Sequence, residues 1–287
     1  MNLLYKYNPQ KGFHTSIVKR GESDLKYIDF GLLKFSETPL SSPRRRGERG
    51  GWGETVTNEE VALILLRGEC ELKITHDSGE ISRVIGPRPN VFREKAYAAY
   101  IPKDSKYEIR TEGAAEIAVC KAPSELNAEP AIITPEQVKV KIVGQHNWKR
   151  QVHDIIDADV NARHLVIGET FNPPGNWSSS PPHRHDYENP PEECDMEEVY
   201  FFKIHPEQGF GVQRVYTDDL SLNETYTIEN NDTVAIPRGY HPVAAGPGYQ
   251  LYYLWMLAGE NRVLRPKDDP NHAWLKFCEP IVAEVMK

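Results

Sequence analysis

The sequence predicts an all-β protein built from two tandem β-barrel or jelly-roll domains. Short runs rich in β-branched and aromatic residues recur along the 287 residues, and Gly, Pro or Asn-Asp turns separate them. The composition, with 22 Pro, 20 Gly and 14 Tyr, favours strands and turns over helices. A strand that ends in Ile-Pro and leads into a turn occurs in each half, in AYIPKDSKYEI and VAIPRGYHPV. We interpret this as a weak internal repeat, which two tandem barrels would produce.

The first domain is expected to span residues 1–125. Its predicted strands are residues 27–35, 60–67, 69–76, 98–101, 107–111 and 115–122. We interpret EVALILLRGECELKIT as a hairpin that bends at Gly68. The preceding segment, SSPRRRGERGGWGE, is polar and rich in glycine, so we interpret it as a solvated loop. Its arginines could be mistaken for a binding patch: Arg44, Arg45, Arg46 and Arg49.

The second domain, residues 126–287, repeats the scheme. Its predicted strands are residues 138–143, 152–156, 165–171, 197–204, 210–216, 224–228, 233–236 and 250–257. The stretch APSELNAEPAIITPEQ is rich in Pro, Ala and Glu and is the natural linker between the domains. Residues 270–287 are the best candidate for a helix, which would form a C-terminal tail.

Charge and hydropathy exclude several classes of protein. Because 34 Lys and Arg stand against 42 Asp and Glu, the net charge is −8, which argues against a nucleic-acid-binding protein. The longest apolar runs, residues 61–66 and 251–258, are far shorter than the roughly 20 residues of a membrane helix. The N-terminus lacks the pattern of an export signal, and the cysteines form no CxxC pair, so we expect a cytoplasmic protein with reduced thiols.

Three histidines and a glutamate in the second half form a candidate metal site. His183 and His185 are two residues apart, so both imidazoles point to the same side of an extended chain. The strand that follows places Glu198 and Tyr200 on one face, and His241 comes just after a strand and a Pro-x-Gly bend. Three neutral imidazoles and one carboxylate suit Zn²⁺, Mn²⁺, Fe²⁺ or Ni²⁺ and leave positions open for substrate or water.

This order of motifs resembles that of the cupin superfamily, whose members are small double-stranded β-helix barrels with a metal at the mouth. Longer segments resemble the 5-deoxy-glucuronate isomerase family of bacterial inositol catabolism: PPHRHD, EEVYFFKIHPEQGFGVQRVYTDD and ENNDTVAIPRGYHPVAAGPGYQLYYLWMLAG. That family is similar to the uronate ketol-isomerase of pectin breakdown. The resemblance covers nearly the full chain and implies a bicupin, two tandem double-stranded β-helix (jelly-roll) barrels, in which the C-terminal barrel holds the metal.

Two departures from the general cupin pattern stand out. The insertion DYENPPEECDM follows His185 and leaves the metal carboxylate open between Glu197 and Glu198, of which we favour Glu198 because it directly precedes Val-Tyr. Only one residue, rather than two, separates Gly239 from His241.

The first half lacks the metal ligands. No HxH motif precedes its Ile-Pro bend, which carries Lys106 and Tyr107 near the position that Tyr240 and His241 occupy in the second half. The first domain is therefore expected to be a degenerate cupin barrel that serves as scaffold and dimer surface in a homo-oligomer.

The resemblance implies an aldose–ketose isomerisation of a uronate, 5-deoxy-glucuronate to 5-dehydro-2-deoxygluconate, through an enediol. A divalent metal would stabilise the enediolate as a Lewis acid, and a general base would move the carbon-bound proton. The candidates for that base are Glu198, Tyr200, Glu169, Tyr252 and Tyr253.

The substrate's carboxylate calls for an arginine, whose planar fork matches it. Arg238 is the first candidate and Arg214 the second, although each could equally form a surface salt bridge. Tyr252 is a further candidate to contact the substrate. The remaining histidines that we considered are interpreted as packed or exposed: His76, His153, His164 and His205.

Other functions stay open, because a metal sphere does not fix the reaction. Three histidines and a glutamate around Fe²⁺ would also suit a cupin dioxygenase, and a related metal-dependent uronate isomerase is a further alternative. A non-catalytic cupin that binds a sugar acid is the third. Neither the metal, the general base nor the oligomeric state follows from the sequence.

Overall fold

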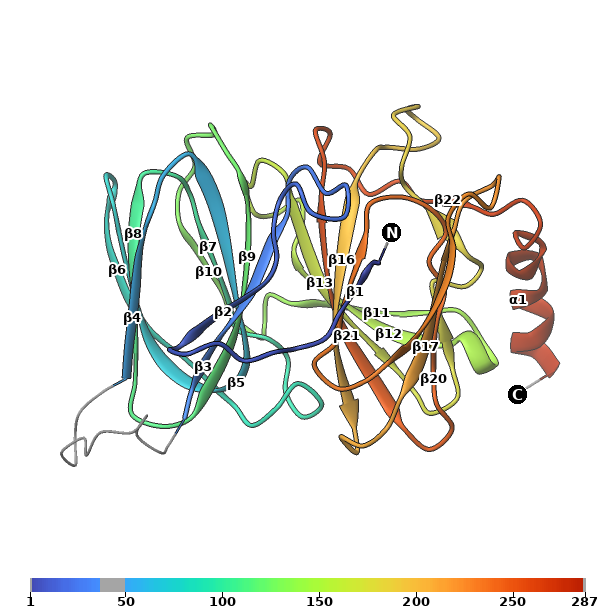
Figure 1. Cartoon of the computed structure of the whole chain (residues 1–287), viewed down its shortest axis with the longest axis horizontal. Coiled ribbons are helices and arrows are strands. Elements are labelled where there is room, and N and C mark those ends of the chain that lie inside the picture. The colour runs from blue at the N-terminus through green and yellow to red at the C-terminus, as the bar shows by residue number, and fades with distance from the viewer. Residues whose placement is uncertain (1, 37–49, 286–287) are drawn as a thin grey trace.

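Two β-barrels lie side by side in the computed structural model, which describes residues 2–36 and 50–285 (Figure 1). The first barrel is a nine-stranded sheet with β2 (His14–Val18), β3 (Asp29–Phe35), β4 (Gly50–Val56), β5 (Glu59–His76), β6 (Gly79–Arg88), β7 (Ala98–Ile101), β8 (Ser105–Thr111), β9 (Ala115–Pro123) and β10 (Ala131–Ile133). All of its pairings are antiparallel.

The second barrel is built around a seven-stranded sheet with β1 (Leu4–Tyr5), β11 (Lys139–Val143), β12 (Arg150–Ile156), β13 (Leu165–Asn172), β16 (Glu197–His205), β19 (Thr233–Ile236) and β21 (Gln250–Ala258). A second sheet contains β14 (Trp177–Ser178), β17 (Gly211–Tyr216), β18 (Asn223–Ile228) and β20 (Val243–Ala245), and a small one pairs β15 (His183–Arg184) with β22 (Lys267–Asp268). The 3-10 helix η1 (His146–Trp148) precedes β12, and α1 (Trp274–Val285) lies at the outer end of this barrel.

The fold class is confirmed: the chain is mostly β, forms two tandem barrels and has a helix near its C-terminal end. The repeated Ile-Pro bends mark equivalent places, because β7 ends at Ile101 and β19 ends at Ile236. Most predicted strands are present with ends shifted by a few residues, and the predicted tail helix is α1, shorter than expected.

The predicted hairpin at Gly68 is wrong. β5 runs through this residue as one strand of 18 residues, pairing first with β7 and β9 and then with β6 and β8. Gly68 has a φ of 91°, and a Cβ there would lie 2.2 Å from the carbonyl oxygen of Ala114. The glycine therefore lets the strand bend from one part of the barrel to the next without reversing.

The loop predicted before this strand is partly wrong. Residues 50–56 form β4, which pairs with β8, whereas the four arginines of this segment lie outside the described residues. β6 was not predicted, because most of its side chains are exposed and polar and give no apolar run.

Strand alternation divides the apolar side chains between three cores. One core fills the first barrel and another fills the second, where Tyr253 and Trp255 of β21 point inward. The third lies between the barrels and takes the alternate residues of the same strand, Tyr252 and Leu254. The two large sheets thus pack against each other by their outer faces.

A buried ion pair crosses this interface. The guanidinium of Arg88 donates to both carboxylate oxygens of Glu169, at 2.8 and 3.0 Å, and both side chains are inaccessible to solvent. The hydroxyl of Tyr252 donates to Glu169 Oε1 at 2.8 Å. Burial alone would raise the pKa of Glu169, but Arg88 lowers it overall.

Sheet pairing also crosses the predicted domain boundary. Leu4 of β1 pairs with Val234 in the second barrel, and Ile132 of β10 pairs with Ala99 in the first. The division at residue 125 remains a prediction.

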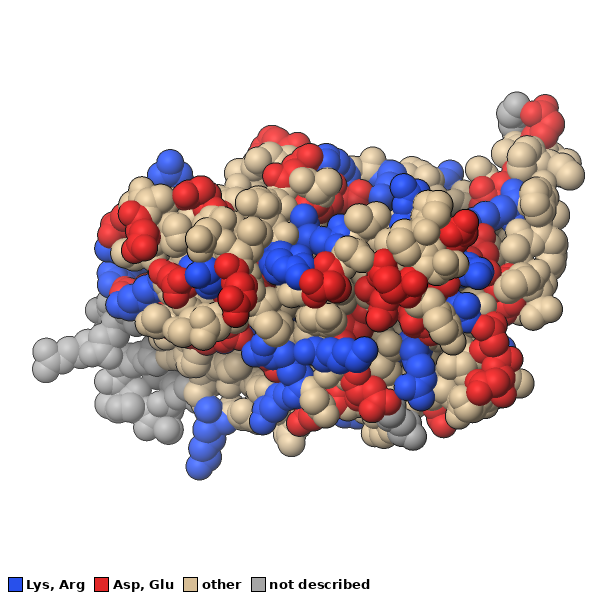
Figure 2. All heavy atoms as spheres, turned by 90° about the horizontal axis from the view of Figure 1, so that it is seen from above, with Lys and Arg blue, Asp and Glu red and all other residues tan. Residues whose placement is uncertain are grey.

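The surface carries mixed charge. On the face in Figure 2, Lys and Arg are interspersed with Asp and Glu. No helix in the described part of the chain is long and apolar enough to cross a membrane. The four cysteines are free thiols: Cys70, Cys120, Cys194 and Cys278.

Candidate metal centre

His185, Glu198 and His241 meet inside the second barrel. Each offers one ligand atom, and these atoms all lie within 4.8 Å of one another. The Nε2 atoms of the two histidines are each 3.2 Å from Glu198 Oε2, and all three residues are buried. Segments that are far apart in the sequence therefore converge on one point.

The local backbone structure explains why these side chains face one another inside the barrel. Glu198 lies on β16 with its side chain on the inward face, in register with Ile236 of β19. His241 follows the turn at Gly239, whose φ is 94° and where a Cβ would lie 2.6 Å from the carbonyl oxygen of Tyr216. The amide of Gly239 donates to Asp186 Oδ2 at 2.7 Å, which ties this turn to the segment that carries His185.

Backbone carbonyls orient both imidazoles. His185 Nδ1 lies 2.6 Å from Met196 O, and His241 Nδ1 lies 2.9 Å from Gly239 O. A protonated Nδ1 that donates to a carbonyl leaves the Nε2 lone pair free for a cation. Although close to Glu198, His241 Nε2 makes no hydrogen bond within the described part of the chain. A buried nitrogen without a proton donor, beside a carboxylate, fits a divalent metal.

Burial controls the protonation of these groups. It lowers the pKa of His241 to about 4, so this imidazole is neutral near pH 7, as a metal ligand must be. Burial also acts to lower the pKa of His185, but the hydrogen bond and charge of Glu198 raise it overall.

His183 stands beside the cluster. It lies on β15, and its ring centroid is 4.9 Å from that of His241 and 6.3 Å from that of His185. Burial and the two neighbouring histidines lower its pKa well below the usual value. Its Nε2 or Nδ1 does not belong to the group within 4.8 Å, so its place as a fourth ligand remains a prediction.

The two adjacent glutamates point in opposite directions, and the structure places Glu198 in the cluster. Glu197 faces the first barrel, where its carboxylate accepts hydrogen bonds from the amides of Lys26, Tyr27 and Ile28 at 2.6–2.8 Å. It therefore links the barrels rather than facing the histidines.

Tyr200 lies next to the cluster on the same face of β16 as Glu198. Its ring centroid is 5.8 Å from that of His241, and its hydroxyl lies 3.2 Å from Ser179 Oγ. Burial, and after it the charge of Glu198, raises the pKa of Tyr200 well above its usual value, so the phenol keeps its proton. Tyr253 stacks beside Tyr200 at 4.4 Å, with its hydroxyl on Ser178 Oγ.

The structure does not bring Glu169 and Tyr252 to the cluster. Both lie on the opposite face of their strands, in the interface between the barrels, where Glu169 accepts hydrogen bonds from Tyr252 and from Arg88. Strand alternation sets this outcome: Thr170 and Tyr253, one position further along, face the barrel interior instead.

The two predicted arginines also lie outside the cluster. Arg238 is exposed and pairs with Asp24 at 3.2 Å. Arg214 donates from Nε and Nη2 to Asn223 Oδ1, at 3.0 and 2.9 Å, and lies over the ring of Tyr216. Arg214 nevertheless lines a cavity of about 390 Å³ that also touches the prolines next to His183 and His241.

Sequence reasoning missed three buried polar residues of the second barrel: Arg150, Asn172 and Gln213. The side-chain amides of Asn172 and Gln213 are inaccessible and have no hydrogen-bond partner among the described residues. Gln213 alternates with Gly211 and Val215, so its inward position could have been read from β17, but no motif marks it.

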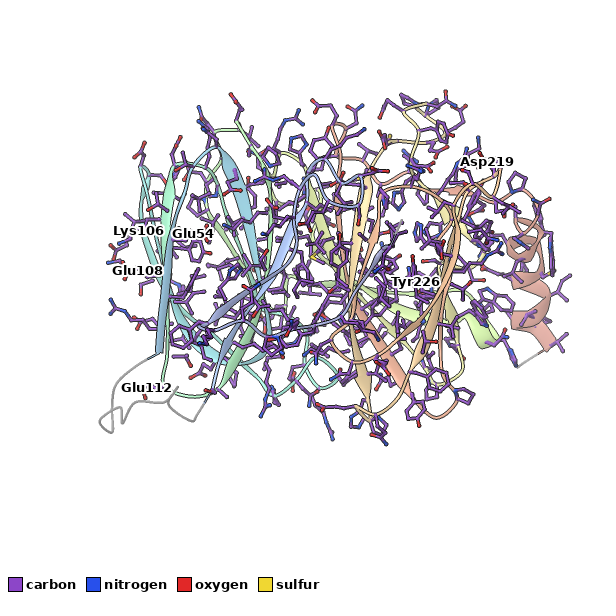
Figure 3. The ribbon with its side chains drawn as sticks, in the orientation of Figure 1. Glu54, Lys106, Glu108, Glu112, Asp219 and Tyr226 are labelled. Atoms are coloured by element: carbon purple, nitrogen blue, oxygen red, sulfur yellow. The ribbon has the colours of Figure 1, made fainter. Side chains whose placement is uncertain are left out.

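In the first barrel, the Ile-Pro bend that corresponds to the bend before His241 carries Lys106 and Tyr107. Tyr107 is buried, and its hydroxyl donates to Glu54 Oε2 at 2.8 Å. Lys106 and Glu108 pair at 2.7 Å on the outer edge of this barrel, where Figure 3 labels them with Glu54.

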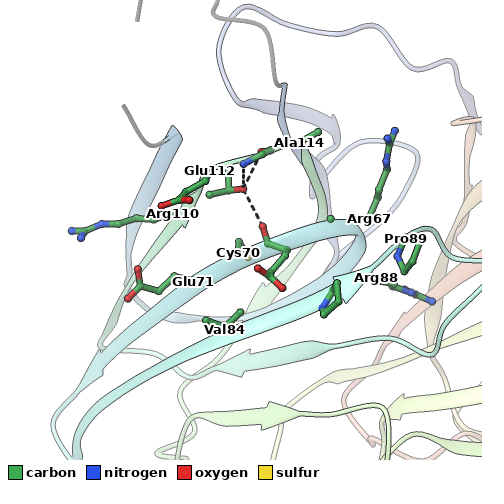
Figure 4. A pocket seen from close by; sticks show the side chains of 14 residues that line it. Arg67, Cys70, Glu71, Val84, Arg88, Pro89, Arg110, Glu112 and Ala114 are labelled. Carbon is green, nitrogen blue, oxygen red and sulfur yellow. Dashed lines mark hydrogen bonds between the residues drawn. The ribbon is translucent and has the colours of Figure 1, made fainter. Parts of the chain in front are cut away.

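A cavity of about 640 Å³ also belongs to the first barrel (Figure 4). It is lined by residues of β5, β6 and β8 together with the segments that follow β6 and β8, including Glu71, Arg110 and Glu112. The side chain of Arg88 leaves it to meet Glu169. This cavity is therefore separate from the histidine cluster.

Comparison with known proteins supports one family. A family model described as KduI/IolB matches residues 5–275. A 5-deoxy-glucuronate isomerase of Geobacillus thermodenitrificans is 42% identical over 223 residues, which cover 77% of this chain and 80% of that relative.

Solved structures agree with this match. An IolB-like protein of Salmonella typhimurium is 31% identical with a TM-score of 0.86, over 96% of this chain and 100% of that one. A variant of oxalate decarboxylase from Bacillus subtilis is 9% identical with a TM-score of 0.60, over 93% of this chain and 79% of that one. The second likeness concerns the fold alone.

Proposed function

The chain belongs to the KduI/IolB family, and on this premise we propose that it is a metal-dependent aldose–ketose isomerase that converts 5-deoxy-glucuronate to 5-dehydro-2-deoxygluconate in inositol catabolism. Its curated relatives are named 5-deoxy-glucuronate isomerases. The observation that carries the proposal is the buried cluster of His185, Glu198 and His241, which offers converging ligand atoms inside the second barrel.

We assign the metal to His185, Glu198 and His241, with His183 as the fourth ligand. The donor set of imidazole nitrogens and one carboxylate oxygen suits Zn²⁺, Mn²⁺, Fe²⁺ or Ni²⁺. When bound, such a cation supplies Lewis-acid stabilisation of the negative charge that develops on the sugar oxygens.

The isomerisation moves one proton from C2 to C1 and a second from the C2 hydroxyl to the C1 oxygen. We assign the first transfer to the Glu198 carboxylate: Oε2 faces the two histidines as a metal ligand, and the other oxygen would remove the proton from C2 and return it at C1. Tyr200 keeps its phenolic proton because of burial, so it donates a hydrogen bond to the substrate oxygen that gains negative charge. Both side chains point to the same side of β16, so the base and the hydrogen-bond donor can contact the same substrate.

The test combines metal analysis with an assay of aldehyde-to-ketone conversion. In the His241→Ala variant we expect bound metal to fall below one tenth and turnover to fall at least about 10³-fold, because one of the converging ligands is lost. His205→Ala is the matched control and should retain both metal and turnover, because His205 lies at the exposed end of β16, the strand that carries Glu198.

Turnover that survives in a metal-free His241→Ala variant would overturn the proposed mechanism. Oxygen consumption in place of isomerisation would identify a dioxygenase. Binding of the uronate without any conversion would identify a sugar-acid binding protein.

A further inference from the structure

Arg150 is a buried arginine on the inner face of the second barrel. It is the first residue of β12, and its exposed fraction is 9%. Along this strand, Val152 packs against the core inside the barrel, whereas His153 faces the other barrel, 3.8 Å from Glu169. Arg150 shares the parity of Val152 and therefore points inward.

Among the described residues, the guanidinium of Arg150 makes hydrogen bonds through one nitrogen only, and their acceptors are neutral. Nη1 donates to the carbonyl oxygens of Trp148 and Ser180, at 3.1 and 3.2 Å. Within residues 2–36 and 50–285, no carboxylate forms an ion pair with it. Burial lowers its pKa, and the groups near enough to oppose this shift are Tyr253, Tyr200 and Glu279.

Arg88, the other arginine that is buried among the described residues, is neutralised, because both of its terminal nitrogens meet Glu169. Arg184 is partly buried and lies 3.3 Å from both Asp186 and Glu193, whereas the partly buried Arg262 donates to backbone carbonyls. A buried positive charge without an anion is costly, so an unpaired arginine inside a barrel favours a site that receives an anion. A carboxylate matches the two outward N–H groups of the guanidinium fork.

Arg150 is linked to the metal cluster by a short series of side chains. Tyr253 is near enough to Arg150 to affect its pKa, and its ring centroid lies 4.4 Å from that of Tyr200, which in turn is 5.8 Å from that of His241. Ser180, which accepts from Arg150, precedes His183 by three positions. A molecule with a carbonyl at one end and a carboxylate at the other could contact both.

The same interior holds hydrogen-bonding groups that no described residue satisfies. Asn172 is the last residue of β13 and pairs with Leu251, and Gln213 lies opposite Val243 of β20. Their buried amides provide donors and acceptors of the kind that sugar hydroxyls need. Trp148 and Ser180, whose carbonyl oxygens accept from Arg150, are part of the lining of the cavity of about 390 Å³.

We propose that Arg150 binds the carboxylate of the sugar-acid substrate, while Asn172 and Gln213 hydrogen bond to its hydroxyl groups. This inference rests on the proposed function and replaces Arg238 and Arg214 as the carboxylate-binding residue. It also predicts a preference for a uronate: the neutral aldose, with –CH₂OH in place of the carboxylate, would leave the buried charge unpaired.

The experiment compares Arg150→Met and Arg150→Lys with Arg214→Met as the matched control. We expect Arg150→Met to lower kcat/KM for 5-deoxy-glucuronate about 10²-fold, mainly through KM, and to leave kcat/KM for the neutral aldose unchanged or higher. Arg150→Lys should retain part of the activity, and Arg214→Met should lose less than about threefold. Metal content and melting temperature are measured for each variant.

An equal loss on the charged and the neutral substrate would overturn the proposal and leave Arg150 a structural residue. Binding of D-glucuronate to the metal-loaded protein, measured by calorimetry, tests the inference without turnover. Wild-type binding that Arg150→Met loses and Arg214→Met keeps supports it, even if the isomerase assay fails. Equal binding by Arg150→Met, or no binding by the wild type, contradicts it.

Discussion

At the scale of single residues, one step along β16 changes the role of a glutamate. Glu198 faces the histidines, whereas Glu197 caps three backbone amides of the first barrel. The HxH pair and the Pro-x-Gly bend were recognisable because their spacing alone indicates a metal site. Arg150 could not be recognised in this way. Its inward direction depends on strand register, and its lack of an ion-pair partner depends on where the carboxylates lie in the fold.

The two glutamates should therefore respond differently to substitution. Glu198→Gln should lose metal and turnover with little change in the stability of the metal-free protein, because it removes a ligand charge. Glu197→Ala should keep the metal but lower the free energy of unfolding by roughly 2–4 kcal/mol, since three amides lose their acceptor and that of Ile28 is buried. Urea unfolding and metal analysis of both variants check this, and equal effects in the two would contradict the assignment.

At the scale of elements, β-branched runs predicted most strands, but glycine was ambiguous. The sequence predicts a hairpin turn at Gly68, because a glycine with a positive φ occurs both in turns and at bends within a strand. The strands that pair with β5 distinguish a turn from a bend: the first part of β5 pairs with β9 and the second part with β8. β6 escaped detection for another reason, because an edge strand with exposed polar side chains carries no hydrophobic period.

Gly68 should therefore tolerate a side chain less well than a glycine in an open turn. Gly68→Ala should destabilise the protein by roughly 3 kcal/mol or more, because the added Cβ meets the backbone of Ala114 in addition to the unfavourable φ. Gly79→Ala is the control: its φ is 135°, but nothing lies within 4 Å, so it should cost about 1 kcal/mol. Equal losses in urea unfolding would show that the close approach at Gly68 is unimportant.

At the scale of the whole molecule, the interface between the barrels holds charge as well as apolar surface. Arg88 and Glu169 are 81 positions apart, and no local pattern predicts that they meet. Glu169 was considered as a base because it lies on a strand of the metal barrel, yet it faces the other barrel. The homo-oligomer stays a prediction, which light scattering of the purified protein can test.

The interface ion pair should make stability depend on acid. The pKa of Glu169 in the folded protein is below its usual 4.5, so its contribution is present above about pH 4.5 and is lost as the pH falls through the lowered value. Glu169→Gln should unfold more easily at pH 7, by roughly 3 kcal/mol, and show a smaller further loss on acidification. Thermal unfolding between pH 7 and pH 3 measures both; parallel curves for wild type and variant would contradict this.

The strand β1 has a consequence for how the chain folds during synthesis. The amide of Leu3 donates to the hydroxyl of Tyr226, 223 positions later, and β1 pairs with β19. At 5–20 residues per second, a ribosome needs roughly 10–45 s to make the intervening chain. The first barrel can form in that interval, whereas β1, which precedes it in the chain, cannot pair until β19 has been synthesised. Completion of the second barrel is thus a late event that joins the earliest strand to one of the last.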